Sequence, residues 1–120
     1  MNHQKLNCYC LLLDFAKRMP ALIDALPKGN SYLEDQVKRA LSSAILNLSE
    51  GNGRSSVKER RRFFDFSLGS IAEVASIIDV MSAYGYITSR QEENLKSDLR
   101  RIYAMIINLK KYVPTWKSSY

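Results

Sequence analysis

The chain has little proline, glycine, cysteine or histidine, and it has no long hydrophobic run. Three prolines and five glycines in 120 residues leave room for long regular elements. The longest uncharged, mostly apolar run, Leu6 to Leu13, is far shorter than the roughly 20 residues that a membrane-spanning helix needs. The start lacks the pattern of a signal peptide, because His3 and Lys5 lead into a polar Asn7. We therefore expect a cytoplasmic protein with no membrane partner.

The scarce cysteines and the single histidine argue against a metal site. On a helix, the spacing of Cys8 and Cys10 turns their side chains about 200° apart, so neither a disulfide nor a shared metal is favoured. We expect one of them to be buried and the other partly buried. His3 has no histidine partner, and the sequence lacks a Glu-x-x-His pattern and a phosphate-loop motif. The sequence therefore predicts no cofactor, no metal and no enzymatic activity.

The composition is that of one globular domain. Hydrophobic residues make up 46% of the chain and charged residues 25%, which is unlike a disordered protein. We expect a single domain over residues 1–120, with a short loose tail from about Thr115. The net charge of +6 favours a polyanion as partner, such as nucleic acid, an anionic membrane face or an acidic protein. Many basic domains bind none of these.

Apolar residues recur at helical spacing through most of the chain, and no stretch alternates as a strand would. Pro20 should kink or split the first helix, because its ring removes one backbone hydrogen bond and crowds the preceding turn. The predicted helices cover about Gln4–Leu26, Ser31–Ser49, Val57–Tyr84 and the segment from Thr88 or Ser89 to Pro114. Short polar turns separate them. We therefore predict an all-α fold, an antiparallel up-down-up-down four-helix bundle.

Several residue patterns mark the ends and faces of these helices. Gly85 is a natural residue to follow the end of the third helix. Capping boxes are predicted for Ser31 with Glu34, for Ser56 with Glu59, and for either Thr88 with Gln91 or Ser89 with Glu92. The last helix carries a regular apolar seam, formed by Leu95, Leu99, Ile102, Ile106, Leu109 and Val113. This seam should face partner helices.

The third helix is apolar over an unusually wide arc. Its two stripes are formed by Phe64, Leu68, Ile71, Ala75 and Ile78, and by Phe63, Ser67, Ser70, Val74, Ile77, Met81 and Tyr84. An arc this wide must be covered on more than one side, which would suit an assembly of several copies. The cluster of Ser67, Gly69 and Ser70 would also allow another backbone to approach closely.

The most concentrated positive charge opens the third helix. Cations are disfavoured at a helix N-terminus by the macrodipole, so this arrangement makes more sense beside an external anion. The exposed backbone N–H groups there would bind a phosphate directly. The alternative is a solvated face tied to Glu50, Glu59 and Asp65. The candidate nucleic-acid-binding residues in this segment are Arg54, Lys58, Arg60, Arg61 and Arg62.

A second basic cluster lies on the last helix and the tail. It contains Lys96, Arg100, Arg101, Lys110, Lys111 and Lys117, against Asp98. Several of these residues lie opposite the apolar seam, as on any solvated face, but Arg100, Arg101, Lys110 and Lys111 could extend a footprint for phosphate backbones. The candidates for base stacking are Tyr84, Tyr86, Tyr112, Trp116 and Tyr120, although the first two suit packing at a helix end.

The stretch from Asn47 to Arg54 is the most distinctive part of the chain. Gly51 and Gly53 would supply positive-φ positions that end the second helix and redirect the chain. Asn47, Glu50 and Arg54 would form a polar network at this corner, either buried or between subunits. We expect this trio to have a structural role.

A set of residues spread over most of the chain, from about Pro27 to Val113, resembles a known family. The matching residues are Pro27, Lys28, Leu33, Gln36, Arg39, Ala40, Ser43, Asn47, Glu50, Gly51, Gly53, Arg54, Glu59, Phe63, Gly69, Ser70, Glu73, Gly85, Tyr86 and Ile87. In these residues the sequence resembles the four-helix-bundle proteins encoded in intervening sequences of bacterial large-subunit ribosomal RNA genes. Ile45 departs from the family pattern, which often has proline there, so no kink in the second helix is implied.

The resemblance implies a homopentamer of four-helix bundles. It gives a role in a structural motif or a subunit interface to Arg39, Asn47, Glu50, Gly51, Gly53, Gly69, Ser70 and Glu73. More distantly, the sequence resembles the accessory variability determinant proteins of diversity-generating retroelements. Those are basic pentameric bundles that bind a reverse transcriptase and its template RNA.

Three functions remain open from the sequence. The first is a non-catalytic, basic, homo-oligomeric adaptor that binds structured RNA, a nucleic-acid enzyme such as a reverse transcriptase, or both. The second is a protein–protein scaffold with no direct nucleic-acid role. The third is a structural bundle without a nucleic-acid partner. The charge pattern and the resemblance together favour the first.

Overall fold

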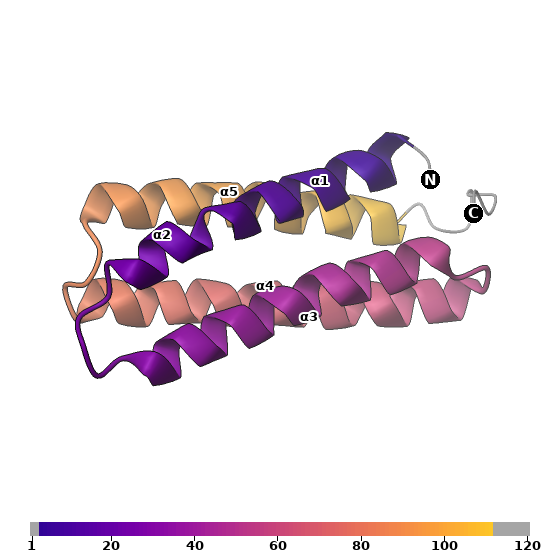
Figure 1. Cartoon of the computed structure of the whole chain (residues 1–120). Coiled ribbons are helices and arrows are strands. Elements are labelled where there is room, and N and C mark those ends of the chain that lie inside the picture. The colour runs from indigo at the N-terminus through magenta and orange to yellow at the C-terminus, as the bar shows by residue number, and fades with distance from the viewer. Residues whose placement is uncertain (1–2, 112–120) are drawn as a thin grey trace.

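The computed structural model describes residues 3–111, and every regular element in this range is an α-helix (Figure 1). The helices are α1 (His3–Lys17), α2 (Met19–Asp24), α3 (Ser31–Gly53), α4 (Val57–Ala83) and α5 (Ser89–Lys111). The prediction of an all-α fold is confirmed. The expected loose tail from Thr115 lies outside the described residues.

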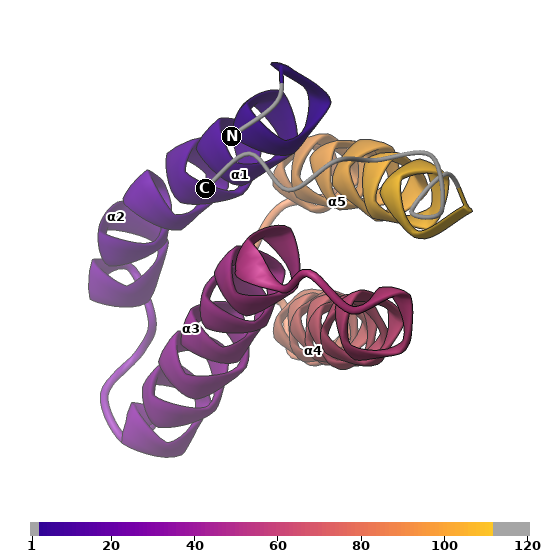
Figure 2. The ribbon, with the colours of Figure 1, turned by 90° about the vertical axis from the view of Figure 1, so that its right-hand side faces the viewer.

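The helices form four antiparallel arms, of which α1 and α2 together make the first (Figure 1). Seen from the end, α1 lies beside α3 and α5, and α4 lies beside α3 and α5 (Figure 2). This is the predicted up-down-up-down bundle. The start of α1, the turn between α3 and α4 and the end of α5 therefore meet at one end, called here the α3–α4 end. The other two turns lie at the opposite end, called the distal end.

Pro20 splits the first arm, as predicted. The chain breaks after Lys17, and Pro20 lies in the first turn of α2, where its missing N–H group would have had no partner within the helix. Met19 and Ile23 remain buried on the core side of α2. The break therefore changes the path of the arm without removing its apolar face from the bundle.

The helix ends at the distal end follow two of the predicted patterns and contradict a third. The hydroxyl oxygen of Thr88 accepts from the N–H of Gln91 at 3.1 Å, and the Gln91 carboxamide accepts from the N–H of Thr88, so the first of the two candidate boxes caps α5. Gly85 has φ +74°. The predicted cap at Ser31 is wrong: Asn30 is the cap residue and makes no side-chain capping bond, because its amide donates to the carbonyl of Pro27.

At the α3–α4 end, Ser56 caps α4 by accepting from the N–H of Glu59 at 3.3 Å, as predicted. The predicted positive φ at Gly51 and Gly53 is wrong, and so is a helix stop at Gly51, although α3 does end at Gly53. The α3 helix continues to Gly53, and the positive-φ residues of the described chain are Gly29 and Gly85. The physical reason lies in packing: a β carbon on Gly51 would come within 2.6 Å of the buried Phe64 ring. Gly51 therefore allows α4 to approach α3 closely.

The core lies along α4, which has α3 on one side and α5 on the other. The α5 seam is buried from Leu95 to Leu109, as predicted, while Val113 lies outside the described residues. Most of both α4 stripes is buried within the single chain, and the hydroxyl of Ser67 donates to the carbonyl of Ala44 at 2.8 Å. The wide apolar arc therefore does not require an assembly, which corrects that argument from the sequence.

By length and composition alone, α4 could also cross a membrane. In the bundle, however, its apolar side chains form the central part of the core, which is the usual reason for such a composition in a helix of a globular protein. We therefore treat α4 as a core helix.

Candidate nucleic-acid interface

Positive charge gathers at the α3–α4 end of the bundle. The cations there are Lys5, Arg54, Lys58, Arg60, Arg61, Arg62, Lys110 and Lys111, and the carboxylates are Glu50, Glu59 and Asp65. In the distal part of the bundle the carboxylates Asp24, Glu34, Asp35, Asp79, Glu92 and Glu93 slightly outnumber the cations Lys28, Lys38, Arg39, Arg90 and Lys96. The fold thus concentrates the excess positive charge of the chain at one end, which the linear sequence could not show.

Two of the predicted nucleic-acid-binding residues, Lys58 and Arg61, are exposed on the first turns of α4. Arg62 is also exposed and lies 3.7 Å from the carboxylate of Glu59. An ion pair this long and this exposed stabilises a protein little, so it leaves Arg62 able to bind another anion. These three cations form a surface that solvent and a polyanion can reach.

Arg60 does not belong to that surface. Its side chain is only 2% exposed, and its Nε donates to the backbone carbonyl of Arg54. A guanidinium in this position holds the end of α3 against the start of α4. The prediction that Arg60 contacts nucleic acid is therefore wrong, and the residue has a structural role in the turn.

Lys5 is a buried cation that the sequence did not reveal. Its Nζ donates to the carbonyl of Asn52 at 3.2 Å, which ties the start of α1 to the end of α3. Burial, together with the positive charge of Arg60, lowers the pKa of Lys5. A lysine near a chain start is usually solvated, so the only available signal was its helical spacing from the buried Cys8 and Leu12.

The second basic cluster is divided by the fold. Lys110 lies at the α3–α4 end, where it pairs with Asp65 of α4 at 2.6 Å, and Lys111 is exposed beside it. Arg100 and Arg101 lie near the middle of α5 and face different helices. Arg100 lines a groove against α4, and Arg101 lines a groove against α1. These two arginines therefore do not form one surface with each other or with Lys58.

The predicted polar trio at the corner is divided in the same way. Arg54 donates to Glu50 at 2.8 Å in an exposed pair. Asn47 instead donates to the carbonyl and hydroxyl of Ser43, whose hydroxyl lies 2.8 Å from that of Ser70. Within one chain the three residues therefore do not form a single buried network, since one part is a surface ion pair and the other joins α3 to α4.

The remaining residues assigned to a motif or interface lie on the outer face of α3 and α4. Arg39, Gly53, Gly69 and Glu73 are exposed, and Arg39 lines a shallow surface groove with Leu46 and Asn47. Gly69 has no heavy atom within 4 Å of the position that a β carbon would take. It therefore does not serve packing within the described chain, unlike its neighbours Ser67 and Ser70, which contact α3.

A cluster of alternating arginine and phenylalanine side chains beside the outer face of α3 and α4 was not predicted from the sequence. The Arg54 guanidinium lies 4.9 Å from the centre of the Phe63 ring, and Arg62 lies 5.9 Å from Phe63 and 5.4 Å from Phe66. The two rings meet edge to face at 6.0 Å. The signal in the sequence was Phe66 one turn after Arg62, at the edge of the stripe that contains Phe63.

Of the predicted stacking aromatics, Tyr84 and Tyr86 contact each other edge to face at 5.6 Å at the distal end. They therefore pack at a helix end, which was the alternative to base stacking that the sequence suggested for them. This end lies far from the basic surface. Tyr112, Trp116 and Tyr120 lie outside the described residues, as does Lys117.

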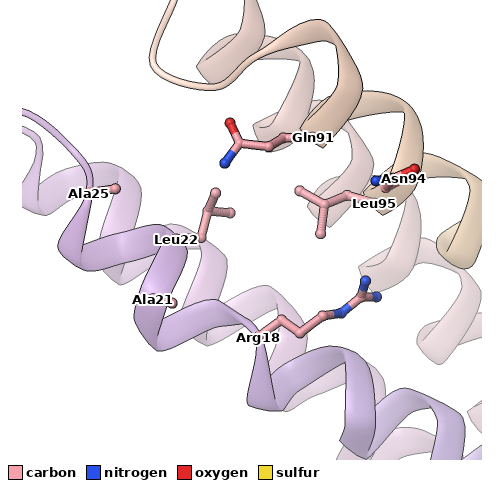
Figure 3. Close-up of a pocket in the computed structure, with 7 residues that line it drawn as sticks. All are labelled: Arg18, Ala21, Leu22, Ala25, Gln91, Asn94 and Leu95. Carbon is pink, nitrogen blue, oxygen red and sulfur yellow. The ribbon is translucent and has the colours of Figure 1, made fainter.

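One cleft lies toward the distal end of the bundle. This cleft of about 280 Å³ lies between α2 and α5, lined by Arg18, Gln91 and Asn94 with apolar neighbours (Figure 3). Arg18 donates to Asp98 at 2.6 Å, so its charge is already paired. Within residues 3–111, no three His, Cys, Asp or Glu side chains are grouped so that they could hold a metal.

The two cysteines differ sharply in exposure. Cys8 is fully buried, and burial raises the pKa of its thiol to about 12. Cys10 is exposed rather than partly buried as expected. The buried thiol is a packing residue of α1.

Together, the fold and the charged surface define a class: a basic four-helix bundle whose candidate site is an exposed end of the bundle. The model of the 23S rRNA-intervening sequence protein family matches residues 4–108, so the chain belongs to that family. A solved structure of a protein of unknown function from the S23 ribosomal protein family of Bacteroides thetaiotaomicron is similar, with a TM-score of 0.81 and 21% sequence identity. The match covers 90% of this chain and 98% of that one. No curated protein matches the sequence.

Proposed function

We propose that the protein is a non-catalytic adaptor that binds structured RNA through the α3–α4 end of the bundle. The observation that supports this most directly is the concentration of cations at this end, with Lys58, Arg61 and Arg62 exposed. An RNA helix presents closely spaced phosphates, and cations on one surface can neutralise several of them at once. The family name, which links these proteins to intervening sequences of ribosomal RNA, is consistent with such a partner.

We further infer that the adaptor acts in the cytoplasm as a homo-oligomer, a pentamer as the family resemblance implies. Exposed apolar side chains on α3 and α4 support self-association, since Leu46 is 64% exposed and Val80 is 37% exposed. A ring of copies would repeat the basic end around one axis. Repetition would raise the apparent affinity for an RNA long enough to contact several copies.

The alternative is a protein–protein scaffold, with a reverse transcriptase of a retroelement as one candidate partner. A groove of about 200 Å³ between α4 and α5 supports this alternative. Its lining is mostly apolar and includes Ala72, Ala75, Tyr103 and Ala104. A partner helix could lay an apolar face in such a groove. Binding of this kind would depend less on salt than binding to phosphates does.

The first experiment is purification with nuclease and high salt, followed by size-exclusion chromatography with light scattering and titration with a structured RNA hairpin. We expect an oligomer that binds RNA and loses affinity steeply as salt rises. An oligomer that ignores RNA at low salt would contradict the adaptor proposal and leave the scaffold. A monomer would contradict the inferred assembly.

A pair of matched variants locates the surface. Replacing both Lys58 and Arg61 by Gln should lower the slope of log K against log salt by about two, because about two phosphate contacts are lost. Replacing Lys28 and Arg90 by Gln removes the same charge from the distal end. This control should leave the slope nearly unchanged. Equal effects of the two variants would show that only net charge matters.

A further inference from the structure

The cluster of Arg54, Phe63, Arg62 and Phe66 has features that the packing of the bundle does not explain. Phe66 is 47% exposed and takes no part in the core. The Arg62 side chain, which contacts both rings, is 59% exposed. The exposed Phe66 ring and the half-buried Phe63 ring alternate with two cations, so this surface is apolar and positive at the same time.

Gly69 keeps one flank of this cluster open. Side chains on a helix lean toward its N-terminus, so a residue three positions after Phe66 would normally cover part of the Phe66 ring. Gly69 occupies that position and has open space where its β carbon would be. Glycine inside a helix is unfavourable relative to alanine. No contact within the described chain requires glycine here, whereas Gly51 is required by Phe64.

We propose that this cluster binds unpaired bases of an RNA loop or single strand by stacking them on Phe66 and the Arg62 guanidinium. The inference deepens the proposed function, on which it rests, by naming the class of RNA. Bases inside a double helix are stacked on each other and cannot reach an exposed ring, whereas unpaired bases can stack on aromatic and guanidinium planes.

The surrounding charge favours a nucleotide over an uncharged partner. Arg54 already pairs with Glu50, but Lys58 and Arg61 lie on the same two turns of α4 as Arg62 and are exposed. A purely apolar partner would have to cover these cations without neutralising them, which is costly. A nucleotide supplies a flat base for the rings and a phosphate for the cations. We therefore assign the cluster to unpaired nucleotides that adjoin a helical RNA segment.

The test uses two fluorescent RNA probes with the same number of phosphates, a hairpin with a long unpaired loop and a blunt duplex. Phe66→Leu keeps an apolar side chain and removes the aromatic face. We expect it to weaken binding of the loop probe by between about fivefold and about 150-fold, the range for one base stacked on an aromatic ring. Binding of the duplex probe should change by less than about twofold.

Two further variants separate stacking from charge and from access. Arg62→Lys keeps the charge but loses the planar guanidinium, so it should weaken the loop probe more than the duplex. Gly69→Leu should cover the Phe66 ring and weaken the loop probe, while Gly69→Ala, its control, adds only a methyl group in open space. Circular dichroism and light scattering of each variant check the fold and the oligomer.

Each result bears on a different proposal. Wild-type protein that binds neither probe would overturn the adaptor function and this inference together. Wild-type protein that binds both probes, with Phe66→Leu reducing both equally or neither, would overturn the stacking inference alone. A change in oligomeric mass on Phe66→Leu would assign the ring to an interface between copies, which also overturns it.

Discussion

The two ends of the bundle keep their turns together by different means. At the distal end, local backbone devices shape the turn between α4 and α5, and exposed or part-buried side chains add bonds from Ser82 to Glu92 and from Lys96 to Asp79. Gly85 has φ +74°, the N–H of Tyr86 donates to the carbonyl of Met81 at 2.9 Å, and the N–H of Gly85 donates to that of Ser82. This is a Schellman motif, and the capping box of Thr88 follows it.

At the α3–α4 end, where Ser56 also caps α4, buried side chains reach between helices. Arg60 donates to the Arg54 carbonyl, Lys5 donates to the Asn52 carbonyl, and Gly51 lies against the Phe64 ring. Two buried cations thus satisfy carbonyl groups near the end of α3, which would otherwise lack partners. The cations at this end therefore belong to two populations: Lys5 and Arg60 are buried and structural, whereas Lys58, Arg61 and Arg62 are exposed.

The largest expected effect is a difference in stability between variants of two adjacent arginines, the buried Arg60 and the exposed Arg61. Arg60→Ala should lower the free energy of unfolding by about 2–3 kcal/mol, because it removes a buried side chain and its hydrogen bond to the Arg54 carbonyl. Arg61→Ala, at an exposed position, should change it by less than about 0.5 kcal/mol. Urea unfolding of both variants measures this. Similar losses would contradict the assignment of Arg60 to the structure.

The next effect tests the close approach of α3 and α4. Gly51→Ala should destabilise the protein by about 1–3 kcal/mol, because the new methyl group would overlap the buried Phe64 ring. Gly69→Ala is the matched control within a helix, and it should stabilise the protein by about 0.5–1 kcal/mol. Thermal unfolding of the pair should give shifts of opposite sign. Stabilisation by both variants would show that helix propensity outweighs the contact with Phe64 at Gly51, and destabilisation by both would contradict the open space at Gly69.

At the distal end, the expected losses are smaller and come from the backbone. Gly85→Ala should cost about 1–2 kcal/mol, since alanine resists a positive φ. Thr88→Ala should cost about 1 kcal/mol by removing the α5 cap. Neither variant should change RNA affinity, because both lie far from the basic surface. Loss of RNA binding in either one would mean that the two ends are coupled.

The smallest effect concerns the buried thiol in α1. Burial raises the pKa of Cys8 from 9.0 to about 12, so the folded protein keeps a proton that the unfolded chain loses. The stability that this thiol contributes is complete below about pH 9 and is lost as the pH rises toward 12. The loss between pH 8 and pH 10 should be about 1 kcal/mol relative to Cys8→Ala. Urea unfolding at both pH values checks the sign, and an equal pH dependence in the variant would contradict it.

The helices themselves could be predicted because their signals are local. Apolar spacing predicted all four arms, and Pro20 predicted the break in the first one. Ser56, Thr88 and Gly85 predicted three of the helix ends. The end of α3 could not be predicted from its glycines alone. Whether Gly51 redirects the chain or admits a ring depends on Phe64, which lies 13 residues away and on another helix.

The candidate site was predicted only in outline. The run of cations from Arg54 to Arg62 was evident in the sequence, but the burial of Arg60 depends on the turn that α3 and α4 make together. Arg100 and Arg101 are adjacent in the sequence, yet they face α4 and α1. Apolar periodicity identifies residues that reach the core, and it does not identify Phe66, because the Phe66 side chain stays exposed.

The segment from Arg54 to Phe66 has a consequence for how the protein could diversify. Within these 13 consecutive residues, Arg60 and Phe64 point into the bundle, while Lys58, Arg61, Arg62 and Phe66 point outward. Substitutions at the outward positions can therefore alter which ligand is preferred without disturbing the inward ones. Under the proposed function, related proteins would acquire different RNA preferences by changing a few neighbouring codons, while the rest of the gene continued to specify the same bundle.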